Sequence, residues 1–174
     1  KCVFYENTLG VLTNSPSFDW QLTNLNNYVN LKSGAVTENT VGSLELHSFG
    51  GGSGMLGLPG DFTPPSRFVR AAFFQTTAPK LADAEKTVIQ AFHILNNFDL
   101  PIGVQTAAGT TPPDIPSATQ FTTATDLCGR KIYIRTMFNS HIRVVELNKI
   151  NFARAKFRSE LLDPDRREPV EPLF

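Results

Sequence analysis

Apolar residues recur at two different spacings along this chain, and these spacings predict strands at both ends with helices between them. Residues 1–6 and 10–14 alternate or run apolar around a turn signal, which predicts a β-hairpin whose second strand ends at Asn14. Apolar residues then recur at helical spacing, which predicts a helix over about 18–31 that lies on this hairpin.

The middle of the chain is polar and rich in turn-forming residues before a helical pattern returns. Residues 32–41 read as a loop, and residues 44–49 predict a short strand or an extended segment. The pair Pro64-Pro65 predicts an extended approach, after which Ser66 caps a helix over about 66–76.

The last third of the chain predicts one helix, one loop and an antiparallel meander. A stripe of apolar residues predicts a helix over about 82–97, with Asp83 near its start. Threonine, proline and alanine dominate residues 106–116, which read as loop. Three strand-like runs follow, separated by short turns, over residues 120–126, 131–137 and 142–147.

The order of strands, helices and strands, joined by hairpins and not by crossovers, predicts an α+β fold with antiparallel sheets packed against helices. Residues 153–174 are charged and contain prolines, which predicts an extended C-terminal tail. The sequence shows no internal repeat and no second domain.

Composition excludes several classes of protein. The 174 residues are 41% hydrophobic and 18% charged, which is ordinary for a globular domain and argues against disorder. Sixteen basic residues balance sixteen acidic ones, so the chain lacks the basic surface expected of a nucleic-acid-binding protein. No apolar run approaches the roughly 20 residues that a membrane span needs.

The sequence offers no recognisable metal, cofactor or disulfide framework. Cys2 and Cys128 could pair, remain free thiols or fill buried positions, and they identify no cellular compartment. Residues 52–57 match the pattern G-x-G-x-x-G, but prolines follow where a dinucleotide site needs a helix. The histidines are scattered without metal-ligand spacing, at His47, His93 and His141.

Two runs each place one strong polar side chain among apolar residues and turn-formers. Asn14 lies within residues 10–20, and Arg67 lies within residues 54–70. A carboxamide donor and a guanidinium held in this way could position an oxygen anion, but neither group is a nucleophile.

Simpler interpretations of these residues remain open. Asn14 before Ser-Pro is also typical of a turn. Arg67 lies in the first turn of the predicted helix, where the dipole disfavours a cation, so its guanidinium either pairs with a carboxylate such as Asp61 or presents itself to one. Arg70, one helical turn later, could be a surface charge.

Both runs resemble a known family. Residues 10–25 read Gly-Val-Leu-Thr-Asn-Ser-Pro-Ser-Phe-Asp-Trp-Gln-Leu-Thr-Asn-Leu, and residues 54–73 read Gly-Met-Leu-Gly-Leu-Pro-Gly-Asp-Phe-Thr-Pro-Pro-Ser-Arg-Phe-Val-Arg-Ala-Ala-Phe. With a weaker echo at residues 131–136, they resemble the choloylglycine hydrolase family of linear-amide hydrolases, which includes bile salt hydrolases and penicillin V acylases. The resemblance runs from about Val3 to Phe152.

The resemblance implies an N-terminal-nucleophile hydrolase with an αββα sandwich. The family's nucleophile is a cysteine at the mature N-terminus, activated by its own α-amino group. The first segment of the family pattern, which carries that cysteine, has no counterpart in this chain. Residues 1–152 would then form the C-terminal part of a single domain, followed by the tail at 153–174.

The resemblance also assigns roles to the two polar residues. Asn14 would donate its side-chain amide to the oxyanion, and Arg67 would orient and electrostatically support the site. Cys2 aligns with an interior strand and carries an amide nitrogen, not a free amine, so we assign no nucleophile within this chain. We expect the chain alone to be inactive.

The expected activity of the complete protein is hydrolysis of a non-peptide C–N amide bond by acyl-cysteine chemistry, without a cofactor. Its substrate would carry an apolar acyl group, as in conjugated bile salts, phenoxyacetyl penicillin or acyl-homoserine lactones, and the second run looks closer to the penicillin V acylase branch. We expect a bacterial homo-oligomer, in the periplasm or the cytoplasm. The alternative is a non-catalytic domain that binds amphipathic ligands or a partner chain.

Overall fold

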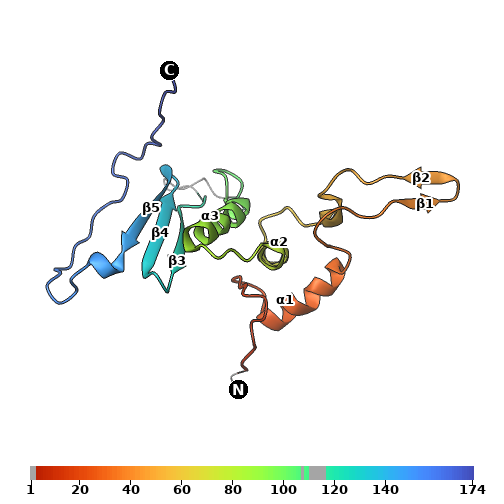
Figure 1. The fold of residues 1–174 in the computed structure, drawn as a ribbon, viewed down its shortest axis with the longest axis horizontal. Coiled ribbons are helices and arrows are strands. Elements are labelled where there is room, and N and C mark those ends of the chain that lie inside the picture. Colours follow the sequence, from red (N-terminus) through yellow and green to blue (C-terminus); the bar gives the residue numbers. More distant parts are fainter. Residues whose placement is uncertain (1–2, 107, 110–116) are drawn as a thin grey trace. The chain divides into compact units, whose positions relative to one another are not determined.

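The computed structural model describes residues 3–106, 108–109 and 117–174, and the chain divides into two compact units (Figure 1). The first unit is Lys1–Pro79 and the second is Lys80–Phe174. Both contain helices and antiparallel strands, which agrees with the predicted α+β class. Among the described residues, no helix combines the length and apolar character that crossing a membrane requires.

The first unit contains two helices with a small hairpin between them in the sequence. Its elements are α1 (Phe18–Asn24), a 3-10 turn (Leu25–Tyr28), β1 (Asn39–Val41), β2 (Leu44–Leu46), a second 3-10 turn (Ser53–Met55) and α2 (Pro64–Thr77). The helix predicted over 18–31 is therefore confirmed as α1 and the 3-10 turn that continues it. The short strand predicted over 44–49 is β2, which pairs with a strand in the predicted loop.

The core of the first unit lies on α2. Phe68 and Val69 are fully buried, and Ala72 follows on the same face at 4% exposure. The Phe68 ring meets Phe18 of α1 edge to face, with centroids 6.0 Å apart. Such a buried aromatic contributes about 1.5–3 kcal/mol through burial, so this contact holds α1 against α2.

Helix α2 begins two residues earlier than predicted. Thr63 is the N-cap, and Pro64 and Pro65 occupy the first two helical positions instead of an extended approach. Proline suits these positions, because its fixed φ is already helical and its missing N–H has no partner there. Ser66 is consequently a residue of the first turn and not the cap.

The predicted N-terminal hairpin is not formed, because the described residues 3–14 contain a turn but no strand. Asn7 takes both backbone groups of Val11: its Nδ2 donates to the Val11 carbonyl at 3.0 Å, and its Oδ1 accepts from the Val11 N–H at 3.3 Å. A short side chain can thus replace the ladder bonds that a hairpin would use. Helix α1 therefore packs on α2 and not on a hairpin.

Residues 32–34 and Gly54 are hydrogen-bonded to each other and form a neck at the base of the segment that carries β1 and β2. The Lys32 N–H donates to the Gly54 carbonyl at 2.9 Å, and the Gly54 N–H donates to the Gly34 carbonyl at 2.9 Å. A Cβ atom on Gly54 would lie 2.5 Å from the Lys32 carbonyl oxygen and 2.6 Å from that of Gly34. Only glycine permits this approach, so the neck depends on Gly54.

The second unit is a helix on a three-stranded meander. Its elements are α3 (Ala84–Leu95), a 3-10 turn (Asn96–Phe98), β3 (Phe121–Asp126), β4 (Lys131–Thr136), β5 (Asn139–Glu146) and a last 3-10 turn (Leu147–Lys149). The strands pair antiparallel in the order β3-β4-β5, which confirms the predicted meander. Asp83 caps α3 by accepting from the Lys86 N–H at 2.7 Å.

The core of the second unit lies between α3 and one face of the sheet. Val88 and Phe92 from α3 cluster with Tyr133 of β4, and Ala124 of β3 packs against them. Strand β5 begins at Asn139, earlier than predicted, because a two-residue connection brings Asn139 opposite Thr136.

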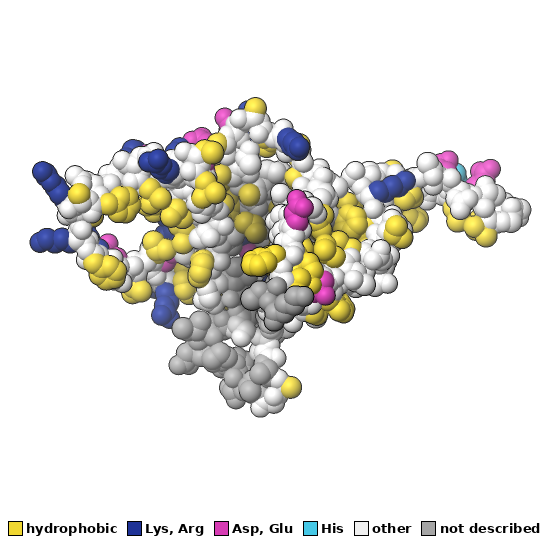
Figure 2. Space-filling view, turned by 90° about the horizontal axis from the view of Figure 1, so that it is seen from below, with side chains coloured by type: hydrophobic (Ala, Val, Ile, Leu, Met, Phe, Trp, Pro, Cys, Tyr) yellow, Lys and Arg dark blue, Asp and Glu magenta, His cyan; other side chains and the backbone are white. Residues whose placement is uncertain are grey.

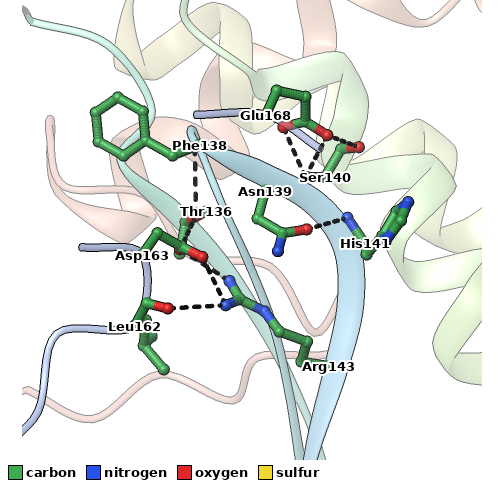
Figure 3. A network of polar contacts seen from close by, with 9 residues as sticks. All are labelled: Thr136, Phe138, Asn139, Ser140, His141, Arg143, Leu162, Asp163 and Glu168. Carbon is green, nitrogen blue, oxygen red and sulfur yellow. Dashed lines mark hydrogen bonds and ion pairs between the residues drawn. The ribbon is translucent and has the colours of Figure 1, made fainter. Parts of the chain in front are cut away.

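The C-terminal segment has no helix or strand after Lys149 among the described residues, as predicted, but it is anchored to β5 (Figure 3). Arg143 Nη1 and Nη2 donate to the two Asp163 oxygens at 2.8 and 3.0 Å, and Thr136 donates to the same carboxylate. The Ser140 N–H and hydroxyl both donate to Glu168. These bonds tie the segment down at two points.

Candidate functional site

Asn14 and Arg67 are in direct contact, although they lie 53 positions apart in the sequence. Asn14 lies in the loop before α1, and Arg67 is the fourth residue of α2. Arg67 Nη2 donates to Asn14 Oδ1 at 2.7 Å. Both residues belong to the first unit, so the two predicted site residues meet within one compact body.

This contact determines which end of the Asn14 carboxamide is available. Because the oxygen accepts from the guanidinium, the Nδ2 group with its two N–H donors lies at the other end of the planar amide and is left for another partner. Asn14 is exposed, and within the described part of the chain its Nδ2 makes no hydrogen bond. The site therefore presents an amide donor to solvent.

Arg67 is half-buried and has no carboxylate partner among the described residues, which leaves it a cation next to an open donor. The proposed pairing with Asp61 is not made. Asp61 instead accepts from the Thr63 hydroxyl at 2.6 Å, the Thr63 N–H at 2.9 Å and the Ser66 hydroxyl at 2.6 Å.

The Asp61 carboxylate organises the start of α2. The hydrogen bond from Ser66, followed by those from Thr63, lowers the pKa of Asp61 to about 2. The ionised group therefore fixes the first helical turn, which is the turn that carries Arg67.

Arg70 is not a surface charge, because only 5% of it is exposed. Its Nη1 donates to the Pro59 carbonyl at 2.7 Å and to the Asp61 carbonyl at 2.6 Å. Burial lowers the pKa of Arg70, Asp61 opposes that change and Arg67 adds to it. Arg70 thus fastens the loop before α2 to the helix and adds a second positive charge close to Arg67.

Gln21 is a residue of this region that the sequence pattern did not single out. It is 1% exposed on α1, and its Nε2 donates to the Ser15 carbonyl at 2.8 Å and to the Thr13 hydroxyl at 3.3 Å. Its position within the predicted helix was the one signal in the sequence, because a polar side chain that the helix buries needs a hydrogen-bond partner inside the protein.

The remaining sequence candidates do not join this site. Cys2 lies outside the described residues. Cys128 is an exposed free thiol in the connection between β3 and β4 of the second unit. Within the described ranges, no three His, Cys, Asp or Glu side chains gather as a metal site would require. The glycine run at 52–57 contains a 3-10 turn (Ser53–Met55), and the next helix begins only at Pro64.

Comparison with known proteins places this geometry in context. The family model "Linear amide C-N hydrolases, choloylglycine hydrolase family" matches residues 1–170. A bile salt hydrolase/transferase from Clostridium perfringens is 40% identical over 147 residues, which cover 84% of this chain and 44% of that protein. A penicillin V acylase from Pectobacterium atrosepticum is 32% identical over 157 residues, covering 82% of this chain and 35% of that protein.

The fold agrees with these matches. The crystal structure of a cysteine-to-alanine mutant of conjugated bile acid hydrolase from Clostridium perfringens aligns with a TM-score of 0.78 and 34% identity, over 97% of this chain and 49% of that one. The chain therefore spans about half the length of the relatives it matches. The higher identity to the bile salt hydrolase does not support the expected nearness to the penicillin V acylase branch.

Proposed function

Because the chain belongs to the choloylglycine hydrolase family of linear amide C–N hydrolases, we propose that it is part of a cysteine N-terminal-nucleophile amidohydrolase. The complete protein would cleave a non-peptide C–N amide bond. Residues 1–152 would form the C-terminal part of one αββα domain, and the nucleophile would come from a segment outside this chain. The matches to hydrolases do not favour a non-catalytic binding domain.

The contact between Arg67 and Asn14 is the observation that carries this proposal. When a thiolate attacks an amide carbonyl, the carbon–sulfur bond forms and negative charge develops on the carbonyl oxygen. Asn14 Nδ2 can donate to that oxygen, because its own oxygen is held by Arg67 at 2.7 Å. A cation bonded to the carboxamide oxygen also polarises the amide and strengthens the donation from its nitrogen.

Arg67 contributes a second effect through its charge. It lies beside the donor and has no carboxylate to neutralise it within the described residues, so its field favours the anionic intermediate over the neutral substrate. Collapse of the intermediate then breaks the C–N bond, and the amine leaves with the proton that the α-amino group took from the thiol. Water hydrolyses the remaining thioester to the acid and regenerates the thiol.

We propose a conjugated bile salt as the first substrate to test, because the more similar relative is named a bile salt hydrolase/transferase. A phenoxyacetyl amide is the second, since a penicillin V acylase is also similar. Both substrates join an apolar acyl group to a polar amine through one amide bond.

An amidase assay on two forms of the protein tests the proposal. The full-length protein and the 174-residue chain are each incubated with glycine-conjugated bile salt and with a phenoxyacetyl amide. We expect release of the amine by the full-length form alone. Activity in the 174-residue chain would show that a nucleophile lies within it, with Cys2 the first suspect, and would contradict the proposal.

A further inference from the structure

One buried side chain contacts the residues on both sides of Asn14. Gln21 donates from Nε2 to the Ser15 carbonyl at 2.8 Å and to the Thr13 hydroxyl at 3.3 Å, so a single amide bonds to both neighbours of Asn14. Within the described part of the first unit, neither the Ser15 carbonyl nor the Thr13 side chain has another hydrogen bond.

The loop would otherwise be weakly constrained. Asn14 and Ser15 are exposed, and the segment forms a bend without strand pairing. Loops with exposed backbone and few hydrogen bonds open at low free energy. The bonds from Gln21 are therefore what ties this bend to the buried face of α1.

Stability alone does not account for a glutamine at this position. Gln21 is 1% exposed, and its Oε1 has no hydrogen-bond partner among the described residues. A buried amide oxygen without a partner opposes folding, and an apolar side chain of the same length would avoid that cost. The benefit of Gln21 lies in its donor group, which is directed at the loop.

We propose that Gln21 is a positioning residue that sets Asn14 for oxyanion donation. Asn14 is then held from two directions: Arg67 fixes its side chain, and Gln21 fixes its backbone. Gln21 acts through Asn14 and not on the substrate. This inference rests on the proposed function, because it assumes that Asn14 donates to the oxyanion.

The test uses the full-length protein with Gln21→Met, which keeps the length of the side chain and removes its donor. Gln75→Met is the matched control, since Gln75 is an exposed glutamine on α2. Removing a whole oxyanion donor costs about 10²–10³-fold in kcat, so misplacing it in Gln21→Met should cost roughly 10–100-fold, with KM within about twofold. The control should retain its kcat.

A double mutant separates positioning from general damage. In the Asn14→Ala background, Gln21→Met should lower kcat by less than about threefold, because residues that act through each other are non-additive. An equal loss in both backgrounds, or an unchanged kcat in Gln21→Met alone, would overturn the proposal. If Gln21→Met does not fold, Thr13→Val removes one of the two contacts of Gln21, and its kcat is compared in the same two backgrounds.

Backbone NMR relaxation distinguishes failure of this inference from failure of the proposed function. Full activity of Asn14→Ala would remove the oxyanion role. NMR order parameters of the backbone amides at residues 13–15 would then decide whether Gln21 positions the segment: we expect them to fall below about 0.6 in Gln21→Met and to be unchanged in Gln75→Met. Unchanged order parameters in Gln21→Met would overturn the positioning role.

Discussion

The Asn14 carboxamide shows how one hydrogen bond can turn a common loop residue into a donor with a defined direction. Asparagine carries an acceptor and a donor on one planar group, and in a turn either could face solvent. The guanidinium of Arg67 has only donors, so it bonds to the Asn14 oxygen and not to the Asn14 nitrogen. The orientation of the amide follows from the chemistry of its partner.

Replacing Asn14 tests the donor directly. In the full-length protein, Asn14→Ala should lower kcat by about 10²–10³-fold, or about 3 kcal/mol in the barrier, because an oxyanion donor acts mainly in the transition state. KM and the thermal midpoint should change little, since the side chain is exposed. Steady-state kinetics measure the effect, and an unchanged kcat would remove Asn14 from the oxyanion role.

Replacing Arg67 tests the second half of the pair. Arg67→Met removes the bond to Asn14 and the local charge, and a hydrogen bond to a charged group contributes about 1.5–3 kcal/mol, so kcat should fall by roughly 10–100-fold. Combined with Asn14→Ala, the loss should be smaller than the product of the single losses. Arg154→Met, at an exposed position in the second unit, is the control. Independent, multiplicative losses would contradict a shared role.

At the scale of elements, the sequence pattern predicted the helices and strands that short-range interactions determine. The periodicity of α3 and its cap at Asp83 are both readable from sequence, and so are the three strands of the meander. The hairpin before Asn14 failed because the Asn7 side chain takes the backbone groups of Val11. Apolar alternation reports side-chain burial but not which groups accept the backbone hydrogen bonds.

The contacts of the candidate site residues could not be predicted from the sequence. Two sequence runs singled out Asn14 and Arg67, and the resemblance to the family implied their roles, whereas the contact of Gln21 with Ser15 depends on how α1 packs under the loop. Asp61 is close to Arg67 in sequence, but Thr63 and Ser66 are closer to Asp61 and donate to it from their hydroxyls. Such competition between partners is settled only by the folded geometry.

The start of α2 should respond to acid. The folded-state pKa of Asp61 is about 2 against an ordinary value of 3.8, so its hydrogen bonds stabilise the protein fully above about pH 4. Between about pH 4 and pH 2 the unfolded state takes up the proton first, and this contribution is lost. Asp61→Asn should therefore show a smaller drop in urea midpoint between pH 5 and pH 3 than the wild type.

The comparison needs a carboxylate that α2 does not use. Asp165→Asn, at an exposed position in the C-terminal segment, serves as the control and should follow the wild-type curve. If Asp61→Asn also followed that curve, the carboxylate would not be a stabilising acceptor at the helix start.

The anchor of the C-terminal segment can be tested with paired substitutions. Asp163 is 12% exposed and forms a two-pronged ion pair with Arg143, which lowers the pKa of Asp163 through hydrogen bonding (Figure 3). Arg143→Met should release this segment, measured as roughly tenfold faster hydrogen exchange of the Arg166 amide, which donates to the Asp163 carbonyl at 3.2 Å.

A neighbouring ion pair supplies the control. Arg158 pairs with Glu160, but both side chains are mostly exposed, at 79% and 69%. Exposed pairs contribute little, so Arg158→Met should leave the exchange unchanged. Equal effects of the two substitutions would show that the segment is not held by Asp163.

At the scale of the whole molecule, much apolar surface faces solvent. Figure 2 shows hydrophobic side chains at the surface on the face it presents, and the exposed residues include large aromatics in both units, among them Phe4, Phe49 and Phe157. Apolar patches of this kind are typical of surfaces that other protein covers. The sequence pattern did not indicate that the chain divides into two units at Pro79.

This surface predicts association of the isolated chain. Purified alone, the 19.2 kDa chain should elute in light-scattering chromatography above its monomer mass, because association removes apolar area from water. Added low levels of detergent should return it towards the monomer. A monodisperse 19.2 kDa species without detergent would contradict the prediction.

The neck at Gly54 has a practical consequence for engineering. Because Lys32 and Gly34 bond to Gly54, the ends of the intervening segment are fastened before the β1–β2 hairpin begins. Lengthening a closed loop costs only about 0.6 kcal/mol for each doubling. Residues 37–47 therefore form an interchangeable cassette, into which an epitope tag or a reporter peptide can be grafted without rebuilding the helices on either side.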